Sequence, residues 1–331
     1  MTTSAPEPAS IVVMGTGGFA VPAFRALLAS RHRVSAVVTR PAHAPPGRRP
    51  PPNPMADAAA AAGVPLLAPE RVNDAASAAE IAALRPALFF VCDYGQLLSA
   101  ALLGVAPHGG LNLHGSLLPR HRGAAPVQWA ILEGDAVTGV SVIHMTPALD
   151  AGNVVSARST PIGPTETAAT LEARLAAVGA EAVLQAVEAV LAAGPGAAVG
   201  SPQDPAGVTR APRISKADGI VDWAQPAERI ERMRRAFEPW PRTAAYLVAG
   251  AGRPPVRIGL EDVAVLPGAS PEAVLPGSIL AAGAEGLVVG CGGGTRLLIR
   301  RIVPEGKRGM AVADFLRGHP LFEAARLQSS A

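Results

Sequence analysis

The sequence predicts an α/β domain built on a doubly wound, mostly parallel sheet, followed by a second, smaller domain of short strands. In the first half, short apolar runs alternate with helical patterns, as in successive β-α-β units. In the second half, β-like runs separated by Gly and Pro favour a small barrel or sandwich. The 331 residues are 49% hydrophobic and 17% charged, which excludes a disordered chain and is enough for two cores.

The first domain is expected to span residues 1–193. Its strands are predicted at residues 11–14, 34–39, 88–91, 110–114 and 140–145. The run at 88–91 is continuously apolar, as expected for a strand buried on both faces. Helical spacing predicts helices at residues 21–30, 55–62, 126–132 and 167–192. Residues 40–54 are rich in Pro and Arg, and predict no regular structure.

A linker is predicted at residues 194–213, because Gly194 and Pro195 end the long helix and no periodicity follows. The second domain, residues 214–331, should contain a helix at 226–236. Its strands are predicted at residues 256–258, 263–266, 278–281, 286–289 and 295–302. Residues 206–331 carry 17 basic and 12 acidic side chains, a net charge of +5, and the rest of the chain carries −2. A basic half can attract a polyanion, although ordinary surface charge gives the same balance.

Composition argues against several classes of protein. No apolar run approaches the roughly 18 residues of a membrane span, and the first ten residues lack the basic start of a secretory signal. Cys92 and Cys291 are too far apart in sequence for a disulfide framework or a zinc knuckle. We therefore expect a cytoplasmic enzyme that uses no metal and does not bind a membrane.

Residues 15–20, Gly-Thr-Gly-Gly-Phe-Ala, follow the first predicted strand and fit a dinucleotide-binding turn. The acidic residue expected about 20 positions later is missing, because the second strand ends in Thr39 and Arg40. An arginine suits a 2′-phosphate, so NADP binding stays open. Equally, the glycines could serve only to pack the first helix against the sheet.

Asn112 and His114 lie at the end of a predicted strand, and alternation places both side chains on one face. An amide and an imidazole at that edge suit the stabilisation of an oxyanion. Asp150 follows the strand at 140–145, which we expect to be a parallel neighbour, so that its carboxylate reaches the same edge. The structural alternatives are a satisfied polar histidine and an aspartate that caps a turn.

The segment from Asn112 to Pro119, Asn-Leu-His-Gly-Ser-Leu-Leu-Pro, continues as Arg-His-Arg-Gly-Ala-Ala-Pro. It resembles the signature of the methionyl-tRNA formyltransferases, within the folate-dependent formyltransferase family. The resemblance covers almost the whole chain. Further matching segments are residues 90–95, 213–216, 221–223, 235–241, 306–310 and 314–318. The matches after residue 213 separate this branch from small-amine formyltransferases that share only the catalytic domain.

The resemblance implies a Rossmann-like formyltransferase domain and an OB-like domain that binds tRNA. It implies that the formyl group of 10-formyltetrahydrofolate, the co-substrate, is transferred to the α-amino group of methionyl-initiator tRNA. The product would serve translation initiation, and the enzyme would be a monomer. Asn112 and His114 would donate hydrogen bonds to the oxyanion, and Asp150 would act as base. The segment lining the folate would be Ser116, Leu117, Leu118 and Pro119. The tRNA acceptor end would meet Arg40, Arg48 and Arg49.

The chain departs from the family pattern at several positions. The turn around Asp150 lacks two flanking acids and a glycine, Asp93 stands where Ala is usual, and Glu238 stands where Asn is common. Three alternatives remain: a folate-dependent formyltransferase acting on an amino sugar, an NADP-dependent oxidoreductase, and a non-catalytic RNA-binding protein. Only the altered turn favours the last.

Overall fold

The structure is a computed structural model that describes residues 8–43, 47, 50–250, 254–270, 274–322 and 325–330. By its internal contacts the chain divides into two units. The first comprises residues 1–126, 137–161 and 171–212, and the second comprises residues 127–136, 162–170 and 213–331.

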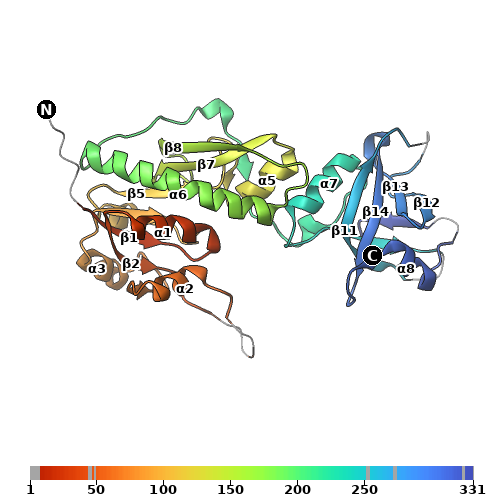
Figure 1. Ribbon diagram of the computed structural model, residues 1–331, viewed down its shortest axis with the longest axis horizontal. Helices are drawn as coiled ribbons and strands as arrows, with labels where there is room; N and C mark the ends of the chain where they lie inside the picture. The colour runs from red at the N-terminus through yellow and green to blue at the C-terminus, as the bar shows by residue number, and fades with distance from the viewer. Residues whose placement is uncertain are drawn as a thin grey trace. The chain divides into compact units, whose positions relative to one another are not determined.

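The first unit is built on a sheet with the strand order β3-β2-β1-β4-β5-β7-β8 (Figure 1). Its strands are β1 (Ser10–Met14), β2 (Arg33–Val38), β3 (Leu66–Leu67), β4 (Leu88–Val91), β5 (Gly110–His114), β7 (Val137–His144) and β8 (Val154–Pro161). The strands from β3 to β5 are parallel, and β7 and β8 are antiparallel to their neighbours. The predicted fold class, a mostly parallel Rossmann-like sheet, is confirmed.

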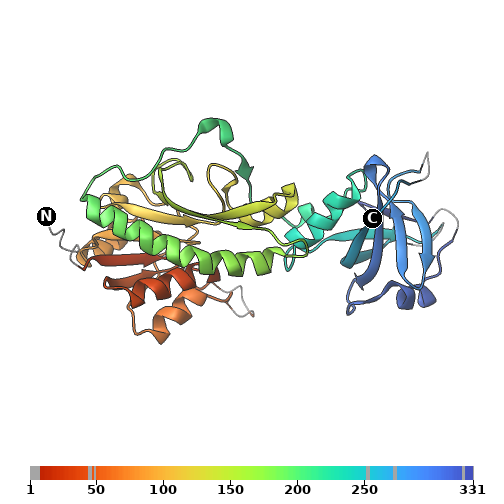
Figure 2. The same ribbon diagram turned by 45° about the horizontal axis from the view of Figure 1, so that its top comes forward.

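Helices follow the strands of this sheet. They are α1 (Val21–Ala29), α2 (Pro54–Ala61), α3 (Ala75–Ala83), α4 (Ala100–Leu103) and α6 (Ala168–Ala193), and a 3₁₀ turn, Gly18–Ala20, precedes α1. The residues of α3 and α4 share an apolar cluster with alternate residues of β1 and β4. Figures 1 and 2 show α6 lying along the sheet.

The long helix α6 corrects one expectation from the sequence. By length and composition, its 26 residues are apolar enough to cross a membrane. Half of its apolar 18-residue stretch is, however, buried inside the protein. A buried face including Leu175 and Val183 runs along it. A Cβ atom added at Gly179 would lie 2.8 Å from Leu113 of β5, so the helix and the strand approach closely. This apolar character is explained by packing against the sheet.

The predicted linker has structure of its own. It contains the 3₁₀ turn Pro205–Gly207 and β9 (Arg210–Ala211), which pairs in parallel with β6 (Arg122–Gly123). Residue Ser201 also pairs with Val154 at the start of β8. A segment of Gly, Pro and Ala without periodicity can be ordered by such backbone bonds, which the sequence does not reveal.

The second unit contains a curled antiparallel sheet with the order β12-β13-β14-β11-β10-β16. These strands are β10 (Ala244–Val248), β11 (Val256–Leu266), β12 (Ile279–Gly283), β13 (Gly286–Gly290), β14 (Arg296–Pro304) and β16 (Arg326–Gln328), and β15 (Met310–Ala311) pairs with β14. Its helices are α5 (Pro126–Glu133), which continues out of the first unit, α7 (Ala227–Ala236) and α8 (Val312–Gly318), with 3₁₀ turns at Ala217–Gly219 and Gly292–Gly294. The edge strands approach each other where Ser278 pairs with Arg326, so the sheet nearly closes into the expected barrel.

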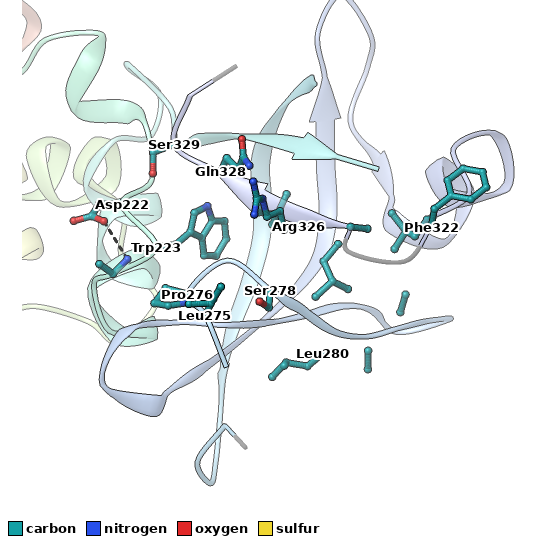
Figure 3. A pocket seen from close by; sticks show the side chains of 17 residues that line it. Asp222, Trp223, Leu275, Pro276, Ser278, Leu280, Phe322, Arg326, Gln328 and Ser329 are labelled. Atoms are coloured by element: carbon teal, nitrogen blue, oxygen red, sulfur yellow. Dashed lines mark hydrogen bonds between the residues drawn. The ribbon is translucent and has the colours of Figure 1, made fainter. Parts of the chain in front are cut away.

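An open cavity of about 920 Å³ lies along this seam (Figure 3). It is lined by residues of both edges and by Trp223, which is 3% exposed, while Leu275 and Phe322 are largely exposed at its rim. None of the predicted site residues lines this cavity.

Candidate active site

Two polar side chains project from the carboxyl end of β5. Asn112 and His114 alternate with Leu113, which faces α6, so both lie on the opposite face of the sheet. His114 is buried and Asn112 is half-buried. Within the part of the chain that the structure describes, the Asn112 amide makes no hydrogen bond, which leaves both its donors available.

The hydrogen bond between His114 and His121 determines the tautomer of the imidazole. Nε2 of His114 lies 2.9 Å from the carbonyl oxygen of His121. A carbonyl oxygen only accepts, so Nε2 must carry the hydrogen. In the neutral ring Nδ1 is then an acceptor, and it lies 3.8 Å from Oδ2 of Asp150. The structure therefore brings His114 and Asp150 together.

Asp150 reaches His114 by a route different from the one predicted. The strand before it, β7, is antiparallel to β5, so the expectation of a parallel neighbour was wrong. His144, at the end of β7, pairs with Leu111 near the beginning of β5. The loop from 145 to 153 must therefore turn back over the sheet to bring Asp150 to His114. Propensity and periodicity do not reveal strand direction, so the sequence could not show this.

The turn that carries Asp150 is held in an unusual conformation. Asp150 has a φ of +51°, and a Cβ atom at Gly152 would overlap the carbonyl oxygen of His144. Aspartate tolerates this left-handed region better than most residues. The backbone N–H of Gly123 donates to Oδ2 of Asp150 at 2.9 Å. The altered turn thus still presents a carboxylate to His114.

Burial and charge act in opposite directions on His114. Desolvation lowers its pKa below the ordinary value of 6.5, while the nearby Asp150 carboxylate favours the charged ring. The net direction is downward, so the ring is neutral at physiological pH. A neutral imidazole whose Nδ1 is an acceptor is suited to accepting a proton, and the facing carboxylate stabilises the cation that results.

The predicted folate segment forms a tight turn after β5. The Ser116 hydroxyl is buried and donates to the carbonyl oxygen of Arg120 at 2.6 Å. Ser141 of β7 secures the turn from the other side, because its hydroxyl donates to the carbonyl of Ser116 at 2.8 Å and accepts from the N–H of Leu118 at 3.0 Å. Ser116 is therefore occupied within the turn, and the partly exposed side chains of 117–119 remain for a ligand.

Sequence reasoning missed contacts from the predicted linker. The Thr209 hydroxyl accepts from the N–H of His121 at 2.8 Å, and Gln203 hydrogen-bonds both Arg122 and the Asp150 turn. The Arg122 guanidinium is bonded to Gln203 and is thereby fixed within the site. No local signal in a Gly- and Pro-rich stretch marks these residues.

The glycine turn after β1 is occupied by an acidic side chain. A Cβ atom at Gly17 would overlap the Asp93 carboxylate, and Thr16 N–H donates to the Asp93 carbonyl at 3.0 Å. Burial raises the pKa of Asp93. A carboxylate at this position repels a pyrophosphate, which argues against the dinucleotide interpretation.

Of the three arginines predicted to meet tRNA, Arg40 is described. It is exposed just after β2, and a Cβ atom at Gly95 would lie 3.1 Å from its Cδ. Arg48 and Arg49 lie outside the described residues. Among the residues that the structure describes, no group of three His, Cys, Asp or Glu side chains is placed to hold a metal ion.

Comparison with known proteins identifies the family. The profile of the formyl transferases matches residues 9–187, and that of the formyl transferase C-terminal domain matches residues 213–320. The chain belongs to the formyl transferase family. The predicted resemblance is thereby confirmed, and Asn112, His114 and Asp150 lie in the part matched by the first profile.

Several relatives of this formyl transferase carry the name methionyl-tRNA formyltransferase. The protein from Rhodopirellula baltica is 42% identical over 329 residues, covering 96% of each chain. That from Nitrosococcus oceani is 41% identical over 315 residues, covering 95% of this chain and 94% of its own. That from Geobacter sulfurreducens is 38% identical and covers 96% of each.

Solved structures of other proteins share the fold. WlaRD, a sugar 3N-formyl transferase, superposes with a TM-score of 0.62 at 12% identity, over 91% of this chain and 99% of its own. HypX from Aquifex aeolicus, solved with tetrahydrofolic acid, gives 0.58 at 18% identity over 95% of this chain and 47% of its own. At these identities the likeness shows the fold alone.

Proposed function

We propose that this protein transfers the formyl group of 10-formyltetrahydrofolate to the α-amino group of methionyl-initiator tRNA. The observation that carries the proposal is the convergence of Asn112, His114 and Asp150 on one face of the sheet in a formyl transferase. The acceptor follows from identities near 40% across both domains to methionyl-tRNA formyltransferases. The shared fold with a sugar formyl transferase does not by itself distinguish the acceptors, but its identity is only 12%.

The oxyanion of the tetrahedral intermediate would be stabilised by Asn112. As the amine attacks the formyl carbon, the carbonyl electrons move to oxygen, and the amide of Asn112 donates a hydrogen bond there. One such donor is typically worth about 3 kcal/mol in the transition state. His114 can add a second donor only after Nδ1 has gained a proton, because its Nε2–H is directed to His121.

The proton lost by the attacking amine passes, in this proposal, to Nδ1 of His114. It then moves to the folate nitrogen as the bond between that nitrogen and the formyl carbon breaks, and the imidazole becomes neutral again. Asp150 stabilises the transient imidazolium from 3.8 Å. We assign proton acceptance to His114, because Nδ1 of its neutral ring is an acceptor, and we assign to Asp150 the stabilisation of the resulting cation.

We propose that the folate lies against the turn of Ser116, Leu117, Leu118 and Pro119. The partly exposed apolar side chains of 117–119 supply surface for its rings, and Ser116 maintains the turn through Arg120. A Cβ atom added at Gly139 of β7 would lie only 2.7 Å from the side chain of Leu117. Leu117 therefore packs directly against β7, and this strand supports the turn.

We assign tRNA binding to the basic C-terminal domain, residues 214–331, and to Arg40, Arg48 and Arg49 of the first domain, residues 1–193. Each phosphate neutralised should contribute about 0.9 to the salt slope of binding. Replacing Arg48 and Arg49 with Ala should weaken tRNA use and leave folate affinity unchanged. An equal loss of folate affinity would contradict the assignment. We further propose a cytoplasmic monomer that does not bind membranes and requires no metal.

The test is a formylation assay with purified protein and 10-formyltetrahydrofolate. Initiator Met-tRNA should be formylated much faster than elongator Met-tRNA, and a nucleotide-linked amino sugar should give no product. Faster transfer to the sugar would support the alternative acceptor. NADPH binding would support the oxidoreductase, and no transfer to any acceptor would support the RNA-binding protein without activity.

A further inference from the structure

The loop that carries Asp150 is tied to the rest of the site by Gln203. Its side-chain Nε2 donates to two backbone carbonyls of that loop, those of Asp150 and Gly152, both at 2.8 Å. Its Oε1 accepts two hydrogen bonds from the guanidinium of Arg122, from Nε at 3.0 Å and from Nη2 at 2.7 Å. All four polar contacts of this half-buried amide are therefore made within the site.

These bonds join two segments that meet at His114. Arg122 follows directly after His121, whose carbonyl oxygen accepts the His114 hydrogen bond, and precedes Gly123, whose N–H donates to Asp150. Gln203 thus fixes the distance between the chain segment that orients the imidazole and the turn that presents the carboxylate.

The Asp150 turn needs such support. Asp150 is held at a φ of +51°, a strained conformation for a non-glycine residue that persists only where neighbouring contacts maintain it. The exposed residues 146–149 before it supply one side-chain hydrogen bond, from Thr146 to the carbonyl of Ala148. The turn is thus fixed largely from outside.

We propose that Gln203 is a positioning residue for the formyl-transfer reaction, acting with Arg122 to hold the Asp150 carboxylate at its working distance from His114. This inference rests on the proposed function. The role is separate from that of the reacting groups, because Gln203 contacts backbone carbonyls and a guanidinium. Loss of its bonds displaces Asp150, and displacements near 1 Å at a catalytic group can cost up to about 100-fold in rate.

The test compares Gln203→Ala with Asp204→Ala, the neighbouring residue whose carboxylate caps the 3₁₀ turn through Ala206 N–H at 2.9 Å. We expect kcat to fall about 10-fold or more in Q203A, with the KM values for both substrates within twofold. Asp204→Ala should retain the wild-type kcat. Arg122→Ala should resemble Q203A, and the double variant should be no slower than the slower single variant, because both act through one contact.

If Q203A fails to fold, Gln203→Glu keeps the acceptor for Arg122 and lacks the donor to the two carbonyls, so the same fall in kcat is expected in a folded protein. A wild-type kcat in folded Q203A or Q203E overturns the proposal. So does an equal loss in D204A, or a multiplicative effect in the double variant. Absence of formyl transfer by the wild type would overturn the proposed function instead.

Discussion

Nε2 of His114 donates to the carbonyl oxygen of His121 at 2.9 Å, and this contact leaves Nδ1 as the ring atom that can exchange a proton. Replacing His114 with Asn keeps an N–H donor and removes the base. General acid–base catalysis is typically worth about 10²–10⁴-fold, so kcat should fall in that range while tRNA affinity stays near wild type. Single-turnover formylation and a filter-binding titration measure the two quantities. Near-wild-type turnover would show that His114 has another role.

The pH dependence of activity should reflect burial of His114. Desolvation lowers the pKa of His114 below 6.5, so the neutral ring, which accepts the proton, persists at pH 6.5 and somewhat below it. The kcat/KM of the free enzyme should therefore decline only at a pH below 6.5. Asp150 opposes the shift, so Asp150→Asn should move the acid limb to still lower pH and reduce the plateau. Asn tolerates the left-handed backbone and keeps an acceptor for Gly123. Rates from pH 5 to 9 test this, and a limb displaced upward in D150N would be inconsistent with it.

Gly17 and Asp93 should be coupled in stability. A methyl group at Gly17 overlaps the Asp93 carboxylate, so Gly17→Ala should cost about 1–3 kcal/mol of unfolding free energy. Asp93→Gly removes the carboxylate and suits the φ of +50° at that position. The double variant should therefore recover most of the loss. Urea denaturation of all four proteins gives the coupling, and strictly additive losses would argue against the overlap.

Arg235 should contribute more to stability than an exposed arginine does. It is 8% exposed, its Nε lies 2.8 Å from Oε1 of Glu231, and Nη1 donates to the carbonyl of Glu166 at 3.2 Å. Arg235→Ala should cost about 1–3 kcal/mol. The control is Arg317→Ala, which breaks an exposed pair with Asp314 and should cost less than about 1 kcal/mol. Comparable losses in thermal unfolding would contradict the ranking.

Neither cysteine should react in the folded protein. Burial raises the pKa of the Cys92 thiol well above its ordinary range and raises that of Cys291 to about 12, so the reactive thiolate is scarce at pH 8. Titration with a chromogenic disulfide should detect both thiols after addition of guanidinium and almost none before. Rapid reaction of either thiol in buffer would disprove this.

Much of the fold could be predicted from local pattern. The apolar run of β4 and the long apolar face of α6 are buried, as their sequence patterns predict. Such patterns predict burial because the removal of apolar surface from water is the main driving force of folding. The strand β8 was missed, because its polar residues, including Ser156, Arg158 and Ser159, interrupt any apolar pattern. The order of β10 to β16 also depends on pairings between distant residues.

The sequence by itself determined the alternation of strands and helices, the placement of Asn112 and His114 on one face of a strand, and the family, because each depends on neighbouring residues or on matching motifs. The tertiary structure decided the antiparallel direction of β7, the tautomer of His114 and the anchoring of Asp150 by Gln203. Those features arise from hydrogen bonds between atoms 7 to 53 residues apart, and local propensity carries no information about such distant partners.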